Sequence, residues 1–166
     1  MGAAPGSWSL YAAERVGPEG RVVAVDLQEI KQQFPSNVVV LRADAFQIES
    51  EPQAESDSAA PEESVTDSVA RHAPYDVVLS DMAPNTSGSK VSDQARSFDL
   101  FMKALAVAGA YGKPGSNFVG KIFMSEDFPK ARAGVAEKYA KVRVIRPEGT
   151  RSGSSEIFVV GMGRRA

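Results

Sequence analysis

The segment GAAPGSWSLYAAERVGPEGRVVAVD, residues 2–26, decides the fold, because it joins a glycine-rich turn, a helix and a β-branched strand that ends in a carboxylate. Small residues in the turn let the backbone approach a ligand, and the start of the helix offers free N–H groups. In nucleotide-binding α/β folds, a carboxylate at the end of the following strand accepts hydrogen bonds from ribose hydroxyls. Gly6 and Asp26 are therefore candidates for holding a nucleotide-like cofactor. The alternative role for Asp26 is a helix N-cap.

Outward from this segment, β-branched runs alternate with helical stretches. Strands are predicted at 21–26, 37–42, 75–80, 117–123, 141–146 and 156–161, and helices at 7–16, 93–111 and 128–139. The strand runs lack a clean alternation of apolar and polar residues, which is typical of strands buried on both faces. Strands that alternate with helices predict right-handed βαβ units. We therefore expect an α/β fold with a mostly parallel sheet and helices on both faces.

The composition indicates one soluble domain over residues 1–166. Hydrophobic residues make up 43% and charged residues 24% of the chain, as in ordinary globular proteins. There is no cysteine and one histidine, His72, which excludes disulfides and cysteine nucleophiles and argues against a histidine metal site or a Ser-His-Asp triad. No apolar run is long enough to span a membrane, and no signal peptide is visible. We expect a cytoplasmic protein that uses no metal.

Charge is unevenly distributed along the chain. Residues 47–70 contain seven acidic residues and no lysine or arginine, whereas residues 130–166 contain nine basic and three acidic residues. The stretch 47–73 is poor in large apolar residues, so we predict a disordered acidic insertion there, with a short helix near 65–71. The basic C-terminal part permits a nucleic-acid partner, although a solvated surface explains the charge equally well.

Four further residues are placed for chemistry. Asp44 ends the second predicted strand and is placed to meet an adenine amino group, or to cap a helix. Asp81 ends the third strand, in SDMAPN. Lys121 interrupts an apolar strand, where a lysine is costly unless it is paired or functional. Glu156 opens the last strand. We expect Asp81, Lys121 and Glu156 to converge at one edge of the sheet, either as a catalytic group or as a structural ion-pair network.

Four motifs carry a family resemblance. GAAPGSWS, SDMAPNTSG, FVGKIF and RPEGTRSGSSEIFVVG occur in this order, and together they resemble the FtsJ-like ribosomal RNA 2′-O-methyltransferases. The resemblance runs from Gly2 to the C-terminus apart from the acidic insertion. It implies a Rossmann-like fold, S-adenosylmethionine as the cofactor, and methylation of the ribose 2′-hydroxyl of a uridine in large-subunit ribosomal RNA.

The resemblance also assigns residue roles. Gly6 and Trp8 match the family's cofactor loop, Asp26 the carboxylate on the cofactor ribose, Asp44 the carboxylate near adenine, and Asp81 the acidic residue beside the methionine part. The family's catalytic tetrad is Lys-Asp-Lys-Glu, and Asp81, Lys121 and Glu156 match its last three members.

The family pattern includes a strand directly before GAAPG and an upstream lysine that is the first member of the tetrad. Neither stands in this sequence. We therefore expect a chain that is incomplete at its N-terminus, with an opening in the sheet between the strands at 21–26 and 75–80.

The implied partner is ribosomal RNA, and we expect a monomer. Five basic residues are candidates for phosphate contacts: Lys130, Lys141, Arg143, Arg146 and Arg151. Two alternatives remain open, namely an impaired fragment that acts as an RNA-binding or ribosome-assembly protein, and a 2′-O-methyltransferase that acts on another RNA. A nicotinamide oxidoreductase is disfavoured because GAAPG lacks the G-x-G-x-x-G spacing.

Overall fold

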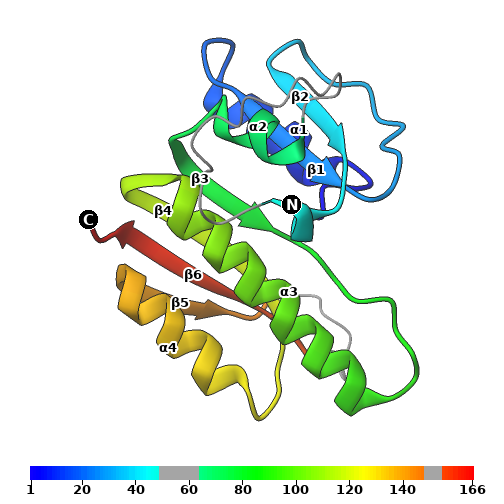
Figure 1. Ribbon diagram of the computed structural model, residues 1–166, viewed down its shortest axis with the longest axis vertical. Coiled ribbons are helices and arrows are strands. Elements are labelled where there is room, and N and C mark those ends of the chain that lie inside the picture. Colours follow the sequence, from blue (N-terminus) through cyan, green and yellow to red (C-terminus); the bar gives the residue numbers. More distant parts are fainter. Residues whose placement is uncertain (49–63, 148–154) are drawn as a thin grey trace.

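The computed structural model describes residues 1–48, 64–147 and 155–166. Its elements form two sheets and the helices that pack against them (Figure 1). Most of the acidic insertion expected at 47–73 therefore lies outside the described residues. The short helix expected near 65–71 is present as α2 (Val65–Ala70), and Val69 of this helix is buried.

The larger sheet has four strands in the order β3-β4-β6-β5. These strands are β3 (Tyr75–Ser80), β4 (Gly112–Phe123), β6 (Glu156–Arg164) and β5 (Tyr139–Ile145). β3 and β4 are parallel, and β6 runs antiparallel to both of its neighbours. β4 begins earlier than the sequence predicts, because Tyr75 pairs with Gly112 before a bulge resets the register to Val77 and Asn117.

The smaller sheet pairs β1 (Val22–Asp26) with β2 (Val38–Arg42) in parallel. It is preceded by α1 (Ser7–Val16), and it leads into a short 3-10 helix, η1 (Ala45–Gln47). β1 and β2 each lie within one residue of their predicted bounds, because each is a short β-branched run bounded by turn residues.

Two helices cover one face of the larger sheet, α3 (Lys90–Tyr111) and α4 (Phe128–Lys138) (Figure 1). The expected apolar stripe of α3 packs into this core, with Phe101, Leu105 and Ala108 fully buried. Further along α3, Val107 and Tyr111 pack in the same cluster as Val25 of β1. α3 therefore spans both sheets and holds them together.

The opposite face of the larger sheet meets α1. Ile157 and Val159 of β6 face the core beneath α3 and α4, so Phe158 between them points to the other face. There the ring of Trp8, at the start of α1, stacks on Phe158 with centroids 5.5 Å apart. Helices on both faces and a mixed arrangement of strands, in which β1–β2 and β3–β4 are parallel and β6 is antiparallel to its neighbours, confirm the predicted α/β, Rossmann-like class.

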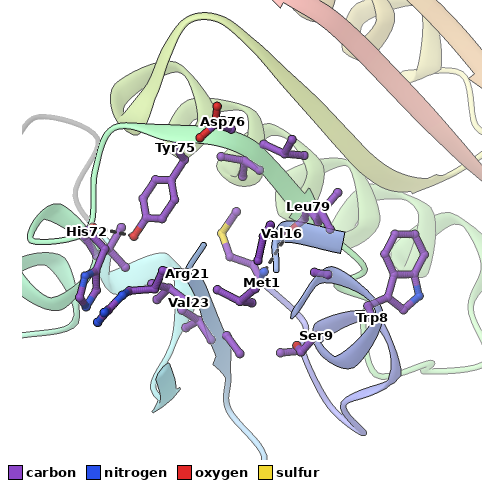
Figure 2. A pocket seen from close by; sticks show the side chains of 18 of the residues that line it. Met1, Trp8, Ser9, Val16, Arg21, Val23, His72, Tyr75, Asp76 and Leu79 are labelled. Atoms are coloured by element: carbon purple, nitrogen blue, oxygen red, sulfur yellow. Dashed lines mark hydrogen bonds between the residues drawn. The ribbon is translucent and has the colours of Figure 1, made fainter. Parts of the chain in front are cut away.

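A cavity of about 610 Å³ separates β1 from β3, and we call it the β1–β3 groove. It is lined by residues 21–25 on one side and 74–79 on the other, and Figure 2 shows Met1 within it. The Met1 amino nitrogen donates to the Leu79 carbonyl (2.9 Å), and its carbonyl accepts from Asp81 N (3.1 Å). Burial lowers the pKa of this amino group to about 6. Among the described residues no strand pairs with the facing edges of β1 and β3, and the opening stands where it was expected.

No helix in the described part of the chain is both long enough and apolar enough to cross a membrane.

Candidate active site

A second cavity, of about 1230 Å³, lies at the carboxyl ends of the strands, and we call it the strand-end cavity. Its walls come from the turn at 2–5, the end of β1 with the loop after it, Asp44 to Phe46, the loop at 81–85, the first turns of α3, and Lys121. Open α/β sheets bind ligands at this edge, because the loops that follow parallel strands meet there.

Asp26 is tied to the glycine-rich turn. Its Oδ2 accepts a hydrogen bond from Ala4 N (2.8 Å) and its Oδ1 accepts one from Gln28 N (2.8 Å). Each carboxylate oxygen can accept more than one hydrogen bond, so both can also receive a hydroxyl in the cavity. Asp26 therefore combines a structural role, holding the turn against β1, with a position suited to binding a ribose.

Asp44 follows β2, the strand that pairs with β1. Its side chain caps η1 by accepting from Phe46 N (2.9 Å). The helix-capping role considered for Asp44 is thus present, and the residue also lines the strand-end cavity. Its role near an adenine ring stays a prediction.

In the glycine-rich turn, the backbone of Gly2 packs directly against the backbone of the loop after β3. Gly2 has φ of +67°, and a Cβ there would stand 2.6 Å from Met82 N, so only glycine permits the contact with the loop after β3. Gly6, with φ of +124°, stands directly before α1. Neither Gly6 nor Trp8 is among the residues that line the strand-end cavity. Trp8 borders the β1–β3 groove instead, so the cofactor role of both residues stays a prediction.

Lys121 lies between two carboxylates. Its Nζ is 2.9 Å from Asp81 Oδ1 and 3.9 Å from Glu156 Oε1, and its side chain is only 11% exposed. Asp81 directly follows β3, Lys121 lies near the end of β4 and Glu156 opens β6, so the predicted convergence is confirmed. Burying an ammonium group is costly, and the two carboxylates offset that cost.

The loop after Asp81 is fastened by a residue that the sequence analysis did not select. Asp93 on α3 is 8% exposed, and its Oδ1 accepts from both Ser87 N (2.9 Å) and Ser87 Oγ (2.8 Å). These hydrogen bonds lower the pKa of Asp93. A signal for Asp93 was available, because it stands eight residues before Phe101, on the side of α3 that carries the apolar stripe.

The Lys121 amine and the carboxylates beside it can therefore orient a hydroxyl by hydrogen bonds. Within the described residues, no cluster of three or more His, Asp or Glu side chains could hold a metal ion.

Comparison with known proteins identifies relatives over nearly the whole chain. A family model described as FtsJ-like methyltransferase matches residues 1–164. "Ribosomal RNA large subunit methyltransferase E" of Sorangium cellulosum (strain So ce56) is 53% identical over 166 residues, which cover 100% of this chain and 71% of that protein. The protein of the same name from Nitratidesulfovibrio vulgaris (strain DSM 19637 / Miyazaki F) is 43% identical over 99% of this chain and 76% of its own length.

Solved structures agree on the fold. A Plasmodium falciparum protein described as a ribosomal RNA methyltransferase has a TM-score of 0.75 and 18% identity, covering 98% of this chain and 83% of that chain. Human methyltransferase-like protein 13 in complex with SAH has a TM-score of 0.60 and 16% identity, covering 98% of this chain and 69% of that chain. At these identities the likeness concerns the fold alone.

Proposed function

Since the chain belongs to the FtsJ-like methyltransferase family, we propose that it transfers a methyl group from S-adenosylmethionine to the ribose 2′-hydroxyl of a uridine in large-subunit ribosomal RNA. The observation that carries this proposal is the placement of Lys121 Nζ between Asp81 and Glu156 at the strand-end cavity. The names of the two bacterial relatives support ribosomal RNA of the large subunit as the substrate.

The residues of the strand-end cavity fit such a cofactor. Asp26 and Asp44 offer carboxylate acceptors for ribose hydroxyls and an amino group, and the small residues Gly2 and Ala4 leave room beside them. Human methyltransferase-like protein 13, which shares this fold, was solved in complex with SAH. When bound, S-adenosylmethionine supplies a methyl group carried on a positively charged sulfur.

The chain's own residues then have separate tasks. Lys121 orients the 2′-hydroxyl and takes up its proton, which makes the oxygen a better nucleophile. Asp81 and Glu156 fix the position of Nζ. A lysine accepts a proton only as the neutral amine, so Lys121 must first give up its own proton to act as the base.

Basic residues near this edge are proposed to hold the RNA backbone. Arg143 and Arg146 are exposed at or just after the end of β5, and β5 neighbours β6, which carries Glu156. Arginine suits phosphate because its planar fork offers several donors.

The test of the proposal is Lys121→Met in a single-turnover assay on large ribosomal subunits that lack the modification, with a labelled methyl donor. We expect a loss of several orders of magnitude in transfer with cofactor affinity retained. Methionine suits a buried strand position, so the fold should survive, and a thermal melt checks this. The matched control is Lys113→Met, since Lys113 is also on β4 and also pairs with an aspartate, Asp76, away from the site.

Three outcomes would contradict the proposal. Near-normal transfer by Lys121→Met would leave Lys121 as a structural partner of the carboxylates. Methyl label on a base would exclude 2′-hydroxyl chemistry, and RNA binding without transfer by the unaltered chain would favour the RNA-binding alternative.

A further inference from the structure

The end of β4 that carries Lys121 has a strand neighbour on only one side. β3 pairs with β4 as far as Ser80 and Gly120, where β3 ends. From Lys121 to Phe123, β4 pairs only with β6. A strand end held on one side is free to shift unless other groups bond to its backbone.

Two side chains of α3 make those bonds. Ser97 Oγ accepts a hydrogen bond from Phe123 N (2.9 Å), and Gln94 Nε2 donates to the Met124 carbonyl (2.6 Å). Ser97 is 2% exposed, so the bond to Phe123 satisfies a polar group that would otherwise be buried without a partner. Gln94 and Ser97 stand one helical turn apart, which places both over the same strand end.

The end of β4 that α3 holds is also paired with the start of β6, the strand that carries Glu156. Phe123 pairs directly with Glu156, and Met124 N donates to the Ser155 carbonyl (2.7 Å). The first turns of α3 therefore hold the end of β4, and this end is in turn bonded to the start of β6, which carries Glu156.

We propose that Gln94 and Ser97 are positioning residues that set the place of Lys121 Nζ relative to Asp81 and Glu156. This inference rests on the proposed function, because it concerns the same lysine. Neither residue lines the strand-end cavity, so their effect passes through the backbone of β4. A displacement of about 1 Å at a reacting group costs on the order of a hundredfold in rate, so a small shift of the strand end is enough to be measured.

The test is the double variant Gln94→Met/Ser97→Ala, which removes both side-chain bonds and keeps the approximate shape of each residue. We expect single-turnover transfer to fall by about ten- to a hundredfold, cofactor affinity to stay within about twofold, and the pH profile of the rate to shift. Each single variant should lose less of the transfer rate, because one of the two hydrogen bonds to the end of β4 remains. The amide hydrogen of Phe123 should exchange faster.

The matched control is Ser116→Ala. Ser116 is also on β4 and also 2% exposed, but its hydroxyl has no hydrogen-bond partner in the described part of the chain. It should leave the rate and the pH profile unchanged. If the double variant does not fold, Gln94→Met alone serves, because Gln94 is only partly buried.

A readout independent of activity separates this inference from the proposed function. The ¹³Cε resonance of Lys121, assigned by its loss in Lys121→Met, should move in the double variant and stay in Ser116→Ala. Faster exchange at Phe123 with an unmoved Lys121 resonance and an unchanged pH profile would overturn the inference. Normal transfer by Lys121→Met would overturn the proposed function, while the resonance would still test the positioning role.

Discussion

Among single residues, Asp26 joins two backbone segments at the candidate site. It holds the glycine-rich turn through Ala4 N and the following loop through Gln28 N, and it faces the strand-end cavity. A ligand bound there therefore meets a carboxylate that is already fixed in place, which reduces the ordering cost of binding.

Asp26→Ala should weaken S-adenosylmethionine binding by about 1–3 kcal/mol, as the loss of a charged hydrogen-bond acceptor does. Titration calorimetry measures the change. Asp76→Ala is the control, since Asp76 is an exposed carboxylate that pairs with Lys113 outside the cavity. Unchanged affinity in Asp26→Ala would remove Asp26 from the cofactor site.

Asp93 predicts a dependence of stability on pH. Its pKa is lowered in the folded chain by the hydrogen bonds from Ser87, so the ionised form stabilises the fold above the unfolded pKa of about 3.9. That contribution is lost as the pH falls through the lower, folded pKa. Asp93→Asn should therefore be less stable than the unaltered chain at pH 7, and the two should converge below about pH 4.

Urea midpoints measured from pH 7 downward show this convergence. A gap between the two proteins that stayed constant with pH would mean that the Asp93 charge does not contribute to stability, and that only its shape matters.

Among the elements, α1 depends on the backbone of the residue before it. Gly6 has φ of +124° and stands at the N-cap position, and an added Cβ would lie 2.9 Å from Gln32 Cβ. The turn, the helix start and the loop at 27–34 are therefore packed together at this point.

Gly6→Ala should lower the melting temperature and weaken cofactor binding, because it combines an unfavourable φ with a steric clash. Gly88→Ala is the matched control. Gly88 also has a positive φ, +82°, and also precedes a helix, but a Cβ there meets nothing within 4 Å. Differential scanning calorimetry should show the larger loss for Gly6→Ala, and equal losses would assign the whole effect to φ.

Across the whole molecule, the β1–β3 groove divides the sheets. Its two long walls are strand edges, and Met1 and Ala3 already bond to β3 and β1 at one end. Such edges gain from pairing with a further strand, since the backbone groups and the apolar side chains both find partners.

A five-residue apolar, β-branched segment fused ahead of Met1 should therefore raise the urea midpoint. Burial of each large side chain stabilises the folded chain by about 1.5–3 kcal/mol, whereas ordering the backbone costs about 1–2 kcal/mol per residue. A Gly-Ser segment of equal length is the control and should leave the midpoint unchanged. If both fusions behaved alike, the groove would not accept a strand.

The sequence alone predicts where most strands and helices lie and which residues are candidates for chemistry. β-branched runs, the glycine-rich turn and the apolar stripe of α3 act over a few residues, so local patterns predict them. It also identified Asp81, Lys121 and Glu156, because charged residues at the ends of buried strands are costly without partners.

Only the tertiary structure decided how these parts meet. The 2.9 Å contact of Lys121 with Asp81, the stacking of Trp8 on Phe158 and the bonds from Gln94 and Ser97 to the end of β4 join residues far apart in the chain. Such contacts depend on the register of the strands and on the packing of α3 across two sheets. Local sequence patterns predict neither of these, because both involve residues far apart in the chain.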